Sequence, residues 1–326
     1  MIISFSGKLF SQDTVRFFAP SPEFNKKRFA SAVCVQGTGY GGSLALLSSA
    51  WYKNYNQTSF HFFDDSKEWL QMDKAGHFVT SWYLGRMGID MMQWSGANNK
   101  KSILYGCAGS FLYLTGLEML DGFSDGWGFS WSDFSANTLG TGFIITQKML
   151  QSSTVVSPLK RGAGGISLKY SFHQTGFPQY RPSLLGKSLS EQLVKDYNGQ
   201  TYWLSLNISS FAPALFPSPG GGGTGLPQSE HRGKGHFPKW LNIAFGYGAE
   251  GMTGGSSNPL FVDDKGNQIT FERYRQYYLS LDIDLTRIKT KSHFIKALAE
   301  TFSFIKIPAP ALEWSKKGMT FHPLYY

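Results

Sequence analysis

Three helix-like segments of this chain each carry a pair of polar side chains one helical turn apart, in otherwise apolar sequence. The segments cover residues 68–93, 99–121 and 130–151. The pairs are Asp73 with His77, Glu118 with Asp121, and Asp133 with Asn137. Side chains three or four positions apart share one helix face. A buried charge is costly unless it is paired, hydrogen-bonded or metal-bound. The pattern therefore predicts apolar helices that converge on one buried polar site.

The composition favours a protein that contacts a membrane. The chain is 41% apolar and 16% charged, with 16% aromatic residues and 37 glycines. A charged fraction below the usual quarter, combined with many aromatics and glycines, indicates lipid contact or close helix packing. The mean hydropathy of −0.22 argues against a classical multi-span transporter. We therefore expect a membrane-associated chain rather than one that is mostly embedded.

The net charge of +9 is uneven along the chain. Residues 1–150 hold 12 Lys and Arg against 11 Asp and Glu, whereas residues 151–326 hold 19 against 11. A basic half suits anionic lipid or nucleic acid. No helix-turn-helix, zinc-finger or RNA-recognition signature accompanies it, so nucleic acid is not an expected partner. The expected partners are membrane lipid or another envelope protein, and the sequence leaves the oligomeric state open.

Hydropathy and turn patterns predict an α+β protein in three regions. Residues 1–28 form an extended leader that reads as the end of a truncated signal peptide. Residues 29–151 form a four-helix, membrane-associated bundle, whose first helix at 29–52 contains the glycine cluster Gly37–Gly42. These glycines make that helix either weak or closely packed on a neighbour. Residues 152–326 form a β-rich, aromatic and basic region.

Alternation of apolar and polar side chains predicts the strands of the C-terminal region. The predicted strands cover residues 165–172, 200–209, 240–249 and 273–287, with a closing strand at 319–326. In the fourth strand, Tyr277, Leu279 and Leu281 share one face, and Ser280 and Asp282 share the other. Short helices are predicted at 186–197 and 291–304, and a Gly- and Pro-rich flexible loop at 217–238.

The polar residues of the helical half form one candidate site with three open interpretations. Its members are Asp73, Lys74, His77, Glu118, Asp121, Ser130, Asp133 and Asn137. The first interpretation is a divalent metal or phosphate site. One imidazole with several carboxylates suits Zn, Mn or Fe. The candidate metal ligands are Asp73, His77, Glu118, Asp121 and Asp133. The second is acid–base catalysis with His77 as the proton shuttle. The third is a structural network in which Lys74 pairs with a carboxylate and Asn137 caps backbone groups.

Local spacing also suggests simpler roles for a few polar residues. Asp64 and Asp65 precede a predicted helix and are expected to cap it. Arg86 and Asp90 are spaced as an ordinary helix ion pair. Ser130 followed by Asp133 resembles a capping box with Asp in place of Glu.

The order of these polar residues resembles that of a known family. The pattern is Asp73-Lys74-x-x-His77, then Glu118, Asp121-Gly122, and Gly128-Phe129-Ser130-x-x-Asp133-x-x-Ala136-Asn137-x-x-Gly140. It resembles the YfiM-like family of predicted periplasmic lipoproteins, a domain of unknown function, and is more distantly similar to VanZ-like membrane proteins. The resemblance covers 70–80 residues and implies a helical envelope protein with no assigned reaction. This chain departs from the pattern because Ser31-Ala32-Val33 before Cys34 is a poor lipidation box.

These observations lead to three functional hypotheses. The first is a cell-envelope protein, on the periplasmic side of a Gram-negative-type bacterium, whose polar cluster binds a metal or a lipid or cell-wall headgroup. The second is a non-enzymatic outer-membrane structural or assembly partner. The third is a metal-dependent hydrolase that acts on a lipid-linked or phosphorylated substrate. The sequence does not decide whether the protein is an enzyme.

Overall fold

The computed structural model describes residues 17–51, 56–153, 162–215 and 238–326. The leader up to residue 16 and the loop predicted at 217–238, apart from Pro238, lie outside these ranges. Backbone contacts divide the chain into two compact units. The first unit contains Met1–Ser66, Thr80–Ile145 and Lys289–Phe302, and the second contains Lys67–Val79, Thr146–Ile288 and Ser303–Tyr326, as far as these ranges are described.

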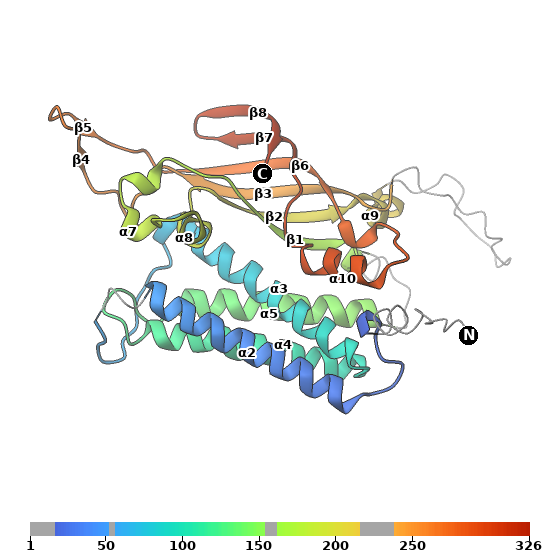
Figure 1. The fold of residues 1–326 in the computed structure, drawn as a ribbon. Coiled ribbons are helices and arrows are strands. Elements are labelled where there is room, and N and C mark those ends of the chain that lie inside the picture. The colour runs from blue at the N-terminus through green and yellow to red at the C-terminus, as the bar shows by residue number, and fades with distance from the viewer. Residues whose placement is uncertain (1–16, 52–55, 154–161, 216–237) are drawn as a thin grey trace, which may run out of the picture. The chain divides into compact units, whose positions relative to one another are not determined.

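Four long helices dominate the N-terminal half (Figure 1). They are α2 (Lys26–Trp51), α3 (Met72–Trp94), α4 (Asn99–Asp121) and α5 (Trp131–Ser152). The helices predicted from hydropathy are therefore confirmed to within a few residues. Asn98 begins α4 by accepting a hydrogen bond from the Lys101 N–H at 2.9 Å, as expected of an asparagine N-cap.

Glycines let α3 and α4 of the first unit approach backbone to backbone. A Cβ placed on Gly88 would lie 2.4 Å from the Gly106 carbonyl oxygen. A Cβ on Gly85 would lie 2.9 Å from a methyl group of Ile144 in α5. By contrast, the cluster Gly37–Gly42 of α2 lies in an intact helix, and a Cβ on any of its glycines would meet nothing within 4 Å. Of the two alternatives predicted for that cluster, close packing on a neighbour is therefore not found at these glycines.

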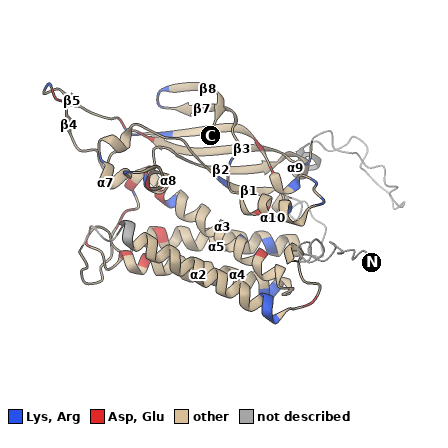
Figure 2. Cartoon of the chain, viewed as in Figure 1, with Lys and Arg blue, Asp and Glu red and all other residues tan. Residues whose placement is uncertain are grey.

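Charged side chains are sparse along the bundle helices, as Figure 2 shows. In α4 they occur only near the two ends, and this helix is long and apolar enough to cross a membrane by length and composition. Of the described helices, α4 alone meets that criterion.

The C-terminal half contains a six-stranded antiparallel sheet in the order β1-β2-β3-β6-β7-β8. These strands are β1 (Ile166–Phe172), β2 (Gln200–Asn207), β3 (Leu241–Glu250), β6 (Tyr274–Ile283), β7 (Ala309–Ser315) and β8 (Gly318–Tyr325). The two-residue strands β4 (Phe261–Val262) and β5 (Gln268–Ile269) pair with each other. The four alternating segments and the closing strand are confirmed.

Short helices connect the strands. They are α7 (Pro182–Leu185), α8 (Leu189–Lys195), α9 (Ile208–Leu215) and α10 (His293–Thr301). Ser188 and Ser292 begin α8 and α10 by accepting a backbone N–H three residues on. The predicted helices at 186–197 and 291–304 are confirmed, and so is the α+β fold class.

The sheet buries a polar face. Lys169 of β1 and Asp282 of β6 form an ion pair of 2.6 Å in which both side chains are nearly inaccessible. Ser205 of β2 donates to the same Asp282 oxygen at 2.6 Å, and Asn242 of β3 donates to Ser205 at 2.8 Å. We call these four residues the sheet cluster. Its hydrogen bonds link four adjacent strands, so the polar groups help to fix the strand register.

Candidate functional site

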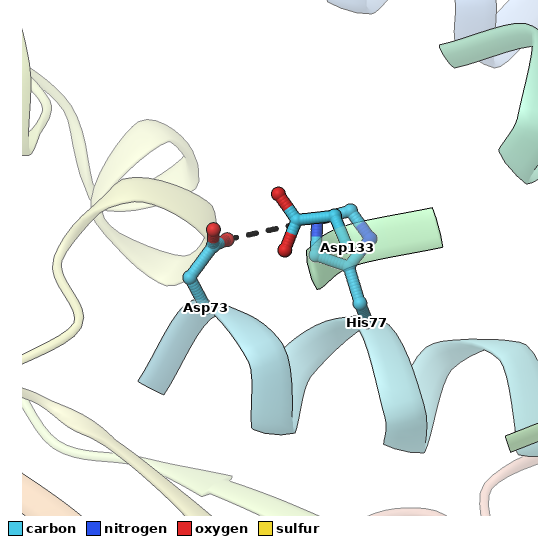
Figure 3. A group of neighbouring side chains, drawn as sticks. All are labelled: Asp73, His77 and Asp133. Carbon is cyan, nitrogen blue, oxygen red and sulfur yellow. Dashed lines mark ion pairs between the residues drawn. The ribbon is translucent and has the colours of Figure 1, made fainter. Parts of the chain in front are cut away.

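The first turns of α3 present Asp73 and His77 on one helix face. Figure 3 shows both side chains leaving the helix on the same side, with His77 Nε2 3.6 Å from Asp73 Oδ1. Gly76 lies between them in the sequence, and a Cβ there would be 2.7 Å from the Tyr202 hydroxyl. Glycine at this position therefore lets the β2 tyrosine pack on the helix backbone beside the pair.

A strained turn precedes α3. Trp69, Leu70 and Gln71 have φ values of 49°, 50° and 63°, a left-handed conformation that costs free energy for residues other than glycine. Two side chains from the sheet hold this turn. The Tyr247 hydroxyl donates to the Leu70 carbonyl, and the Arg275 guanidinium donates to the Gln71 side chain. The sheet thus fixes the direction in which α3 begins.

The Asp73 carboxylate has two hydrogen-bond donors besides its histidine neighbour. Lys74 Nζ lies 2.9 Å from Oδ2, and the Tyr197 hydroxyl donates to Oδ1 at 2.5 Å. Burial raises the pKa of Asp73, but His77, Lys74 and the Tyr197 hydroxyl together outweigh it, so the pKa lies below its ordinary value. The carboxylate is therefore kept ionised, which is the form that binds a cation. The predicted pairing of Lys74 with a carboxylate is confirmed.

Asp133 lies in the first turn of α5, where Ser130 caps the helix. The Ser130 hydroxyl accepts the Asp133 backbone N–H at 3.0 Å, so the serine half of the predicted capping box is confirmed. The Ser130 and Ser132 hydroxyls donate to Asp65 Oδ1 at 2.5 and 2.7 Å. Asp65 therefore supports the start of α5. Asp64 accepts the Ser66 backbone N–H at 3.1 Å, and the capping of the next helix along the chain by Asp64 and Asp65 stays a prediction.

Asp73 and His77 of the second unit place a carboxylate beside an imidazole on one face of α3 (Figure 3). Asp133 of the first unit is a further carboxylate of the predicted polar pattern, and we call these three residues the α3 group. Asp133 is buried, and Asp73 and His77 are half-buried. Two carboxylates and one imidazole form a donor set that suits Zn or Mn. The group contains three of the five candidate metal ligands.

Glu118 and Asn137 form a second contact, between α4 and α5. The Asn137 side-chain amide points to Glu118 Oε1 at 3.5 Å, and both residues are buried. Asn137 thus contacts a side chain. The capping of backbone groups by Asn137 stays a prediction. Asp121 is half-buried at the end of α4.

Sequence reasoning missed Tyr197 and Tyr202, and it missed the contact between Asp65 and the start of α5. Tyr197 hydrogen-bonds a residue 124 positions away, and Asp65 accepts from hydroxyls 65 and 67 positions away. Local spacing carries no signal for such contacts, because they depend on the tertiary fold.

Two glycines of the family-like pattern explain how the connector before α3 packs. A Cβ on Gly122 would lie 2.3 Å from the Phe60 ring, and a Cβ on Gly128 would lie 2.6 Å from Phe63. The connector backbone also bonds here: the His61 N–H donates to the Gly122 carbonyl at 2.9 Å. Only glycine leaves room for this close approach.

The predicted resemblance is confirmed over part of the chain by comparison with known proteins. Residues 61–148 match the family model described as predicted periplasmic lipoprotein (DUF2279). The matched region runs from the connector before α3 nearly to the end of α5 and includes the α3 group. Neither the curated proteins nor the solved structures contain a match to this chain. The similarity to VanZ-like proteins stays a prediction. Over residues 61–148, then, the chain matches a family of predicted periplasmic lipoproteins, which supports a place in the periplasmic cell envelope.

Proposed function

We propose that this envelope protein binds a divalent metal ion through Asp73 and His77, with Asp133 as the further carboxylate ligand that the polar pattern predicts. The observation that carries the proposal is the Asp73–His77 pair of α3, whose ligand atoms lie 3.6 Å apart. Zinc and manganese sites combine imidazole nitrogen with carboxylate oxygen at about 2.0–2.2 Å from the ion.

The surroundings of Asp73 and Asp133 support metal binding. Ligands of a metal site are usually oriented by hydrogen bonds from outer groups. The Tyr197 hydroxyl donates such a hydrogen bond to Asp73. The Ser130 cap fixes the first turn of α5, which carries Asp133. Both carboxylates are thereby presented by secondary structure whose backbone is already fixed.

Metal content of the purified full chain tests the proposal. We expect close to one zinc or manganese ion per chain, measured by mass spectrometry after dialysis with either metal. His77→Ala and Asp73→Asn should lose the ion with unchanged circular dichroism. Asp90→Asn is the matched control, because this carboxylate lies on α3 but pairs with Arg86 at 3.7 Å; it should keep the ion. A folded wild type without metal, or an His77→Ala variant with full occupancy, would contradict the proposal.

The proposed activity is binding, and any reaction would depend on it. A metal-dependent hydrolase would need this ion to activate water or to hold a phosphate. Substrate screening with lipid-linked and phosphorylated compounds is therefore warranted only if the metal is found. A lipid or cell-wall headgroup would be a ligand of the same ion.

We also propose that the protein associates with a membrane. The observation behind this is the distribution of polarity in the bundle: Glu118 and Asn137 are at most 1% exposed, whereas Leu104, Leu112 and Leu139 are 63–69% exposed. Exposed apolar surface of this extent favours contact with lipid or with another protein. Flotation of the full chain with phospholipid vesicles tests the association, and a chain that stays in the soluble fraction would contradict it.

A further inference from the structure

The face of the sheet opposite the sheet cluster is apolar in every strand; we call it the outer face. Strand register aligns one row of aliphatic and phenyl side chains across it: Leu168, Leu204, Phe245, Leu279, Leu312 and Phe321. A second row is aromatic: Tyr170, Tyr202, Tyr247, Tyr277 and Trp314. Since side chains alternate between faces, a slip of one residue would reverse the two faces.

The outer face is exposed at several positions of β3, β6, β7 and β8, whereas Tyr247 is half-buried where it contacts the turn before α3. Phe245 and Leu281 are 50% and 49% exposed, Tyr277 is 53% exposed and Phe321 is 60% exposed. A one-sided antiparallel sheet in water normally buries its apolar face and solvates its polar one. This sheet does the opposite, because it buries the charged pair Lys169–Asp282. Such a distribution is stable where the medium around the outer face is itself apolar.

The ends of the outer face carry aromatic and basic residues, which suit a lipid headgroup layer. At one end Arg275, whose guanidinium also donates to Gln71, is exposed beyond Tyr277, and the turn after β7 carries Lys316, which pairs with Glu272. At the other end Lys239 and Trp240 are exposed at the start of β3. From Leu241 to Tyr247 the strand rises about 20 Å at about 3.4 Å per residue. The apolar band thus lies between two basic, aromatic ends.

We infer that the outer face of β3, β6, β7 and β8 docks on an anionic phospholipid bilayer, with its apolar side chains among the acyl chains. This inference rests on the proposed membrane association and names a surface for it; it is independent of the metal. The sheet order ends at β8, whose outer edge has no neighbouring strand in the described sheet. Because open sheet edges are not tolerated in the hydrocarbon core, the face lies on the bilayer and the sheet does not cross it. The basic ends then contact phosphate groups.

Site-specific quenching in the full chain tests the surface. Cys34 is exposed and Cys107 is buried, so a Cys34→Ser background allows one label to be placed. We place bimane on Leu281→Cys in the outer face, or on Val262→Cys in β4 as the control, since Val262 is 60% exposed in the same unit. Vesicles of phosphatidylglycerol with brominated acyl chains should quench the label at 281 and leave the label at 262 unquenched.

Charge substitutions give a second readout. Phe245→Asp with Leu281→Asp should weaken binding to phosphatidylglycerol vesicles about tenfold or more, because two apolar side chains can no longer enter the acyl region. Leu260→Asp with Val262→Asp removes as much exposed apolar surface outside the outer face and should leave binding unchanged. Both pairs lie at exposed positions, and circular dichroism confirms that each variant folds.

Three outcomes would overturn the inference. If the chain binds vesicles but the label at 281 is not quenched, membrane association stands and this surface is wrong. If the full chain does not bind vesicles at all, both the association and the surface fail. If phosphatidylcholine vesicles bind as tightly as phosphatidylglycerol vesicles, the assignment of anionic headgroups to the basic ends is wrong.

Discussion

The sheet cluster and the α3 group are both polar and poorly exposed, but they differ in the ligand atoms that they offer. In the sheet cluster, Lys169 pairs with Asp282, and the Ser205 hydroxyl and the Asn242 amide extend the network. The α3 group instead combines an imidazole with two carboxylates, one of which also pairs with Lys74. A buried ion pair with its hydrogen bonds is typical of a structural network, whereas an imidazole with two carboxylates is a donor set typical of a metal site. A buried polar cluster is therefore better interpreted by its donor set than by its burial.

The largest expected effect is in the sheet cluster. Asp282→Asn keeps the shape but leaves the Lys169 charge buried without its counterion, which costs about 3–5 kcal/mol of unfolding free energy. Urea denaturation measures the loss. Replacing both partners, as Lys169→Met with Asp282→Leu, should recover most of the stability. If Asp282→Asn unfolds like wild type, the cluster is not the structural network described.

Metal should stabilise the α3 group and leave the sheet cluster unaffected. At a free metal concentration of about 100 times Kd, the chain should gain about 2.7 kcal/mol. Thermal unfolding with and without EDTA measures the gain. Asp133→Asn should abolish it, whereas Glu118→Gln, outside the three-residue group, should keep it. Equal stabilisation of the Asp133→Asn variant would place the ion elsewhere.

The free energy of unfolding should depend on pH through Lys306, which lies next to the sheet cluster. Burial lowers the pKa of Lys306 to about 8, with Lys169 lowering it further and Asp282 opposing the shift. Between that value and its ordinary pKa, the unfolded chain binds a proton that the folded chain lacks, so stability rises with pH by at most about 1.4 kcal/mol per pH unit. Denaturation between pH 7.5 and 9.5 measures the slope. Lys306→Met should flatten it; an unchanged slope would show that another group titrates.

The smallest expected effect is on the ordinary helix ion pair. Arg86 and Asp90 lie 3.7 Å apart at i, i+4, as predicted, and such pairs contribute about 0.3–0.5 kcal/mol. Asp90→Ala should therefore change the unfolding free energy by about that amount and leave metal binding intact. If Asp90→Ala lowered the unfolding free energy as much as Asp282→Asn, a partly exposed ion pair and a fully buried one would not differ in their effect on stability.

Local patterns predicted most of the helices and strands but not which face of the sheet is buried. Helical periodicity located α3, α4 and α5, and alternation located β6 with its two faces. Alternation does not say which face is buried, and here the face of Ser280 and Asp282 is inside. The strand β7 was missed, because Pro308 and Pro310 around its first residue suggest a turn.

The candidate site was also only partly predictable, because local spacing reports contacts within one helix and not contacts between distant segments. The i, i+4 spacing gave the Asp73–His77 contact, because helix geometry alone fixes it. The hydroxyl of Tyr197 could not be anticipated, since its approach depends on how the strained turn at 69–71 directs α3.

The central claim is that the α3 group holds a metal, and X-ray absorption on the zinc-loaded full chain tests it most directly. The account predicts one imidazole scatterer at about 2.0 Å with oxygen ligands completing the shell, and loss of the imidazole signal in His77→Ala. A spectrum with oxygen scatterers alone, or one that His77→Ala leaves unchanged, would contradict it.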